Sequence, residues 1–240
     1  MKKTRNILAT LAIVSVVLIG GCKKDETKVP NQKVVMSPVA MGNASGFAVL
    51  AGAAVTSTGE TTITGDLGLS PGTSVGGFPP GILNGTLRIN DVISNQAKLD
   101  LTAAYNDAAG RTSKDIVTLS GNIGGMTLTP GLYKSTSSLE ISSGDVTFDA
   151  KGESSSVFII QIASTLTTTP GRKVILSGGA LASNIFWQVS SSASFGTTTV
   201  FKGTVMALES ITFDTGATLE GRALARTGAV TMEGNTIVKN

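Results

Sequence analysis

The stretch that decides the fold is residues 194–234, SFGTTTVFKGTVMALESITFDTGATLEGRALARTGAVTMEG, in which one short pattern occurs three times. SFGT at 194–197 is followed 18 residues later by TFDT at 212–215, and TMEG at 231–234 comes 19 residues after that. Repeats of about 20 residues are typical of solenoids, in which each repeat forms one coil and stacks on its neighbours. We therefore predict a stack of coils.

A coil of 18 or 19 residues has room for three short strands and three corners, which predicts a mostly β fold, a β-solenoid of triangular cross-section. TFD at 147–149 and TLT at 165–167 fit the same frame, with a longer insertion at 170–184. TGETTITG at 58–65 resembles TGATLEG at 215–221 with one inserted residue, so we expect the first coil to join the same ladder.

Side chains of a strand alternate between the inside and the outside of the solenoid. The residues predicted to point inward form an apolar column of Phe148, Leu166, Phe195, Phe213 and Met232. The residue before each of them points outward and gives a polar column of Thr147, Thr165, Ser194, Thr212 and Thr231. The sequence thus predicts a flat face that carries a row of Thr and Ser.

Residues 91–109 break the β pattern and predict one long helix. Apolar residues recur there at helical spacing, at Ile93, Ala97, Leu101, Ala104, Tyr105 and Ala108. Asn90 or Asp91 can cap its start and Gly110 its end. Because the apolar stripe must be covered, we place the helix along one solenoid face, over the segments 158–160, 185–187, 205–207 and 223–225.

The charges argue against several functions. Seven of the 19 Lys and Arg lie in residues 1–33, and the rest of the chain holds 12 basic against 14 acidic residues without a basic block, so we expect no nucleic-acid partner. The chain has no His, the commonest general base and metal ligand. We expect no metal, no cofactor and no catalytic residue. The acidic residues show no spacing that singles out a catalytic pair and are predicted to cap corners, at Asp66, Glu140, Asp145, Asp149, Asp214, Glu220 and Glu233.

The first 22 residues have the layout of a signal peptide, with basic residues, an apolar run at 7–19 and the end Gly20-Gly21-Cys22. An apolar run of this length is shorter than the roughly 20 residues of a membrane-spanning helix. The small residues before Cys22 resemble the lipobox of bacterial lipoproteins, in which the cysteine carries the lipid. An ordinary signal peptide with an incidental cysteine is the alternative. Residues 23–45 are predicted to be a flexible tether, and residues 46–240 the folded domain.

Seven segments resemble, in the same order, the widespread microbial ice-binding protein family. They are FAVLAG at 47–52, ITGDLGLSPG at 63–72, YNDAAGR at 105–111, LTPGLY at 128–133, VFIIQI at 157–162, IFWQV at 185–189 and GRALARTGAV at 221–230. The resemblance implies a discontinuous, right-handed, triangular β-solenoid with a long helix alongside. It also implies binding of ice crystals through one flat face, with thermal hysteresis and inhibition of ice recrystallisation.

Some members of that family carry a Thr-Ala/Gly-x-Thr/Asn motif, which TGAT at 215–218 matches, whereas TGAV at 227–230 departs at its last position. The predicted ice-binding residues are therefore the outward column together with Thr215 and Thr218, without the two sets being assigned to one face. The predicted partners are the ice surface and, through Cys22, a membrane. We expect a monomer exported to the outer membrane or cell surface, with extracellular release as the alternative. The alternative is a β-solenoid adhesin for polysaccharide or another surface, which would need exposed aromatic residues among Trp187, Tyr105 and Tyr133. An enzyme is the third possibility.

Overall fold

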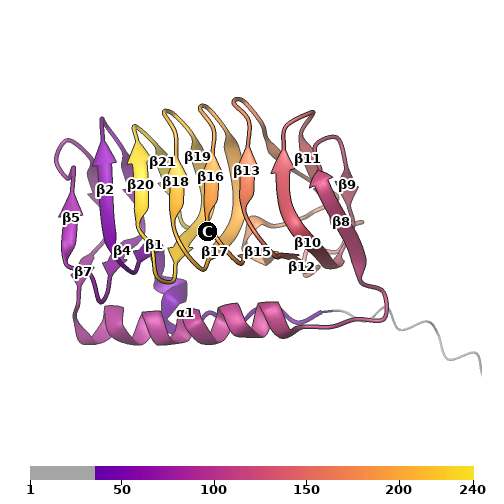
Figure 1. The fold of residues 1–240 in the computed structure, drawn as a ribbon, viewed down its shortest axis with the longest axis horizontal. Coiled ribbons are helices and arrows are strands. Elements are labelled where there is room, and N and C mark those ends of the chain that lie inside the picture. Colours follow the sequence, from indigo (N-terminus) through magenta and orange to yellow (C-terminus); the bar gives the residue numbers. More distant parts are fainter. Residues whose placement is uncertain (1–35) are drawn as a thin grey trace, which may run out of the picture. The chain divides into compact units, whose positions relative to one another are not determined.

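The computed structural model describes residues 36–240, which form a β-solenoid of parallel strands with one long helix, α1 (Val92–Gly110), running alongside it (Figure 1). Each coil passes through three faces. The helix-covered face consists, in spatial order, of β7 (Leu87–Ile89), β4 (Asp66–Leu69), β1 (Phe47–Ala51), the second halves of β19 (Thr218–Ala225) and β17 (Val200–Ala207), β15 (Ile185–Val189), β12 (Phe158–Ile162) and the first halves of β10 (Gly131–Ile141) and β8 (Val117–Asn122).

The second face, here called the Thr/Ser face, is the row of strands that faces the viewer in Figure 1. It consists of β5 (Ser74–Gly76), β2 (Ala54–Thr58), β20 (Val230–Glu233), β18 (Ile211–Phe213), β16 (Ala193–Phe195), β13 (Leu166–Thr168) and the ends of β10 and β8. The third face consists of β6 (Ile82–Asn84), β3 (Thr62–Thr64), β21 (Thr236–Val238), the first halves of β19 and β17, and the small sheet of β14 (Val174–Ser177), β11 (Val146–Asp149) and β9 (Thr127–Leu128).

The order of the coils in space differs from their order in the chain. The first coil, β1 to β3, lies between the last coil and the second one: Val49 pairs with Ala223 on one side and with Leu67 on the other. After β7 the helix carries the chain along the solenoid to its far end, where β8 begins (Figure 1). The expected discontinuous solenoid is therefore confirmed, including the place of the first coil in the common ladder.

The interior of the solenoid is packed with apolar side chains, because alternate residues of all three faces point into it. A chain of aromatic rings crosses it, with ring centroids 4.3–5.4 Å apart, through Phe158, Phe148, Trp187, Phe201, Phe195 and Phe213. Contacts of this kind between rings contribute stability beyond their burial. The Trp187 indole N–H donates to the carbonyl of Lys202 at 3.0 Å, so its one polar group is satisfied.

The helix lies where the sequence predicted it. The Asp91 side chain accepts a hydrogen bond from the Ser94 backbone and the Ser94 hydroxyl accepts one from Asp91, which forms a capping box. The apolar segments predicted to lie under the helix do so, and one residue from each faces it, at Ile159, Phe186, Met206 and Leu224. Ile93 was wrongly assigned to the buried stripe: it is 43% exposed, and Ser94 is buried instead.

Side chains also fix the helix to the solenoid. The Lys98 ammonium donates at 2.6 Å to the carbonyls of Ala225 and of Arg226. The Gln161 amide donates to the carbonyls of Ala108, Ala109 and Arg111, which the helix end leaves without helical partners. Within residues 36–240, no helix has the length and apolar character needed to cross a bilayer.

Residues 36–45, predicted to belong to a flexible tether, instead pack against α1. Val39, Met41 and Ala44 are buried there, which explains why this part of the segment is fixed. A short 3-10 helix, η1 (Gly42–Gly46), is held by the Asp100 carboxylate, which accepts hydrogen bonds from the backbone and side chain of Asn43 at 2.7 Å each. The predicted leader and the first part of the tether lie outside the described residues.

Candidate binding surface

The Thr/Ser face carries one central column of small hydroxyl side chains. In β13, β16, β18, β20 and β2, one residue points outward between two buried neighbours. The backbone register aligns these outward residues across five consecutive coils, as Thr167, Ser194, Thr212, Thr231 and Thr56. Because paired strands lie about 4.8 Å apart, the hydroxyls and methyls repeat at that spacing along the solenoid.

A second column, two residues earlier in each coil, flanks the first. It contains Ser138, Thr165, Ser192, Ser210, Ala229, Ala54 and Ser74. Four of its hydroxyls, from Ser138 to Ser210, are used within the protein. The Thr165 hydroxyl donates to Ser138 at 2.9 Å, and Ser210 accepts the Ala229 N–H at 3.2 Å. These bonds join one coil to the next and fix the edge of the face.

The central column is different, because its hydroxyls remain available to solvent. Among residues 36–240 the hydroxyls of Thr167, Ser194 and Thr212 have no hydrogen-bond partner, and Thr56 and Thr231 share one long contact of 3.4 Å. The side chains directly beneath are buried, at Leu166, Ala193, Ile211, Val230 and Val55. Since the branched Thr side chain is itself stiff, the column presents ordered hydroxyls and methyls on a rigid base.

The structure brings together three of the residues of the predicted column, Ser194, Thr212 and Thr231. Thr165 lies on the same face but in the flanking column. Thr167, and not Thr165, is the residue beside Ser194 in the central column. Thr147 is on β11, in the small sheet of the third face, so its assignment to the column was wrong. The same error affects the inward column: Phe148 and Leu166 are buried, but outside the stack of Phe195, Phe213 and Met232.

The cause of these errors is a change in coil length. Ala193 and Ile211 pair at an interval of 18 residues, whereas Leu139 with Leu166, and Leu166 with Ala193, pair at intervals of 27. The longer coils include a separate strand and turn on the third face. An 18-residue step from Thr165 therefore reaches Thr147 on another face. Thr56 was also missed, because Gly59 follows it by three residues whereas Gly216 follows Thr212 by four, so the repeat at 58–65 points to Val55 instead.

The motif at 215–218 spans a corner. Thr215 is exposed at the edge between the Thr/Ser face and the third face, and its hydroxyl donates to the Glu233 carboxylate at 2.9 Å. Gly216 makes the turn at φ +71°, and the buried Ala217 anchors it. Thr218 begins β19 and points outward on the third face. The two predicted sets thus lie mainly on different faces.

The third face is less uniform than the Thr/Ser face. Thr218 lies in a column with Thr236 and Thr62, but this column ends in Val200 and in Ile82, which is 55% exposed. Beside it, Lys202 and Glu220 form an ion pair. Charged and large apolar side chains therefore interrupt this surface.

Comparison with known proteins identifies the family. A family model described as ice-binding-like matches residues 49–238. The ice-binding protein of Nostoc sp. (strain HG1) is 45% identical over 199 residues, covering 82% of this chain and 72% of the relative. This chain belongs to the ice-binding-like family.

Solved structures of ice-binding-like relatives share the fold. An ice-binding protein from an Antarctic biological consortium superposes with a TM-score of 0.85 at 78% identity, covering 88% of this chain and 96% of that one. An ice-binding protein from the Antarctic ascomycete Antarctomyces psychrotrophicus gives a TM-score of 0.80 at 40% identity, covering 85% and 100%.

Other kinds of site find little support in this member of the ice-binding-like family. Trp187, Tyr105 and Tyr133, which an adhesin would need for stacking on sugars, are all buried. The acidic residues serve locally: Asp66 accepts the Thr86 N–H, and Asp145 accepts the Lys173 N–H, both at 2.9 Å. Within residues 36–240, no group of three acidic or Cys side chains is placed to hold a metal ion.

Proposed function

We propose that this protein binds ice crystals through the Thr/Ser face, without catalysis and without a cofactor. Membership of the ice-binding-like family supports ice as the ligand. The observation that carries the choice of face is the central column, in which five Thr and Ser side chains are aligned over a buried base. Within residues 36–240, three of their hydroxyls have no protein partner and the other two share only one long contact of 3.4 Å.

The physical basis is a rigid, half-apolar array. The methyl groups disfavour free hydration, while the hydroxyls hold bridging waters at little enthalpic cost. A spacing of about 4.8 Å between coils is close to repeats available on ice planes, so water ordered on the face can join the growing lattice. Because the side chains are already fixed, binding does not carry the ordering cost that a flexible surface would incur. Adsorbed protein then hinders growth, giving thermal hysteresis and inhibition of recrystallisation.

Substitution of Thr212 by Tyr tests the face directly. Thr212 lies at the middle of the central column, and its outward side chain can be enlarged without touching the buried Phe213. A phenol ring would hold the ice surface away from neighbouring coils. We expect T212Y to lower ice affinity at least about tenfold, which corresponds to about 1.4 kcal/mol, measured as hysteresis and as the fraction taken into ice during slow freezing.

Thr218→Tyr is the matched control, because it places the same ring outward on the third face. Circular dichroism and thermal melting establish that both variants are folded. Retained activity in T218Y together with loss in T212Y supports the assignment. Loss in T218Y with full activity in T212Y would move the site to the third face, and a folded wild-type protein that stays out of ice would reject ice binding altogether.

We further propose that the protein is exported and held at a membrane as a monomer by a lipid on Cys22. The supporting observation is the sequence itself, in which the only cysteine follows Gly20 and Gly21 at the end of a signal-peptide pattern. The anchor favours a local role, in which the protein limits crystal growth near the cell or attaches the cell to ice.

A further inference from the structure

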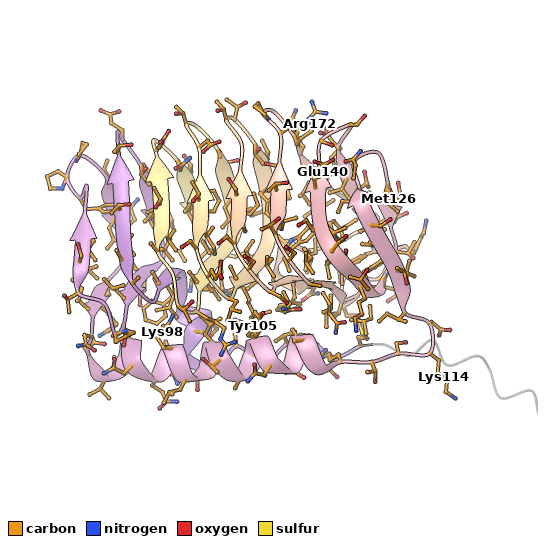
Figure 2. All side chains as sticks on the ribbon, viewed as in Figure 1. Lys98, Tyr105, Lys114, Met126, Glu140 and Arg172 are labelled. Atoms are coloured by element: carbon orange, nitrogen blue, oxygen red, sulfur yellow. The ribbon has the colours of Figure 1, made fainter. Side chains whose placement is uncertain are left out.

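One residue breaks the Thr/Ser face at its β10 end. The central column continues from Thr167 onto β10, where the register places Glu140 beside it. The residues two positions before and after it, Ser138 and Ser142, are again small hydroxyl residues. The β10 coil therefore repeats the pattern of the face on both sides of a single carboxylate, which Figure 2 labels on that coil.

Nothing in the described part of the chain neutralises that charge. Glu140 is exposed and forms no salt bridge with any residue of 36–240, and its carboxylate accepts one hydrogen bond, from the Ser142 hydroxyl at 2.9 Å. A carboxylate holds its hydration shell strongly, and removing that shell without a paired charge is costly. Water around it is oriented toward the two oxygens, unlike water beside Thr methyls and hydroxyls.

Resting on the proposed function of the Thr/Ser face, we infer that Glu140 sets the boundary of the surface that contacts ice. Six coils with uncharged central residues, from Thr167 on β13 to Gly76 on β5, lie on one side of it. On the other side, Glu140 pairs with Asn122, an uncharged residue. Removal of the charge would add the β10 and β8 coils, lengthening the face roughly 1.3-fold at about 4.8 Å for each coil.

The test is the gain of activity in Glu140→Thr. Thr suits an exposed strand position and would complete a Ser-Thr-Ser row across the β10 coil, so the variant is expected to fold. We expect hysteresis at equal protein concentration to rise roughly 1.3-fold, in proportion to the added length of the face. Glu140→Gln retains the length of the side chain without the charge and should also exceed the wild type.

Glu153→Thr is the matched control, because it removes the same charge from an exposed turn between β11 and β12, away from the Thr/Ser face. Its hysteresis should equal that of the wild type. Unchanged activity in E140T while T212Y is inactive would overturn this inference and leave ice binding standing. If hysteresis rises in E140T but stays at the wild-type level in E140Q, the charge of Glu140 does not set the boundary. If hysteresis rises equally in E153T, the effect comes from net charge alone and the inference is overturned.

Discussion

Thr198 has the left-handed backbone conformation that glycine has at the corresponding position of the other coils. Its φ is +57°, and it belongs to a row of left-handed residues along one corner, where its N–H donates to the Thr215 carbonyl of the next coil. The other members are Gly171, Gly216, Gly234 and Gly59. A branched residue with positive φ is strained. The neighbouring coils therefore hold the Thr198 backbone in a conformation that is unfavourable for threonine.

Replacement of Thr198 by Gly should therefore stabilise the protein. Relief of the left-handed strain is worth about 1–2 kcal/mol, and the greater freedom of Gly in the unfolded chain offsets part of it. We expect a net gain of about 1 kcal/mol and a rise of about 2–4 °C in Tm, measured by calorimetry. Thr197→Gly is the control, since its φ is not positive, and it should lower Tm. A fall in Tm for T198G would show that the threonine is preferred there.

At the residue scale, sequence periodicity predicted positions only where coil length is constant. Ser194, Thr212 and Thr231 follow the 18- and 19-residue steps, and the structure aligns them. Thr167 was missed because two 27-residue coils interrupt the period. No periodicity could distinguish hydroxyls free for water from those bonded between coils, since that depends on contacts such as Ser192 accepting the Ser210 N–H at 3.3 Å.

At the element scale, α1 could be predicted from its spacing and cap, but the way it is fixed could not. Its attachment depends on polar contacts that link residues far apart in the sequence. Lys98 donates to carbonyls 127 and 128 residues away, and the Arg226 guanidinium lies 4.5 Å from the centre of the Tyr105 ring. These contacts leave a lysine largely buried between helix and solenoid (Figure 2).

Burial, followed by the charge of Arg226, lowers the pKa of Lys98 from 10.5 to about 8. Below pH 8 the folded and unfolded states both hold this proton, and the cost of the buried charge is fully present. Between pH 8 and 10.5 the unfolded state binds more protons, so the free energy of unfolding should rise with pH. We expect up to about 3 kcal/mol from this group.

Chemical denaturation across that pH range, compared with Lys98→Met, measures the effect. The rise attributable to position 98 should be absent from K98M, whereas Lys114→Met, at an exposed lysine, should retain it. Identical pH profiles for the wild type and K98M would show that the ammonium is as well stabilised in the fold as in water.

At the scale of the whole molecule, the N-terminal part of the described chain lies on the helix side. The Arg111 guanidinium, at the end of α1, donates to the carbonyls of Ser37 and Pro38, and Val39 and Met41 are buried against the helix. The Thr/Ser face is a different face of the solenoid. Attachment through the N-terminus therefore leaves the proposed ice-contacting surface uncovered. Residues 23–35, which would connect Cys22 to the described chain, can span at most about 45 Å when fully extended.

Cys22→Ser should accordingly change where the protein is found without changing how it acts on ice. Because a serine cannot receive the lipid, we expect the full-length variant, expressed in a Gram-negative host, to incorporate no labelled fatty acid and to be released or mislocalised. Its hysteresis per mole should equal that of the detergent-solubilised wild type. Thr27→Ser, beyond the proposed lipid site, should stay in the pellet. Incorporation of labelled fatty acid into C22S would exclude Cys22 as the lipid site, and reduced activity of the variant would show that the anchor contributes to ice adsorption itself.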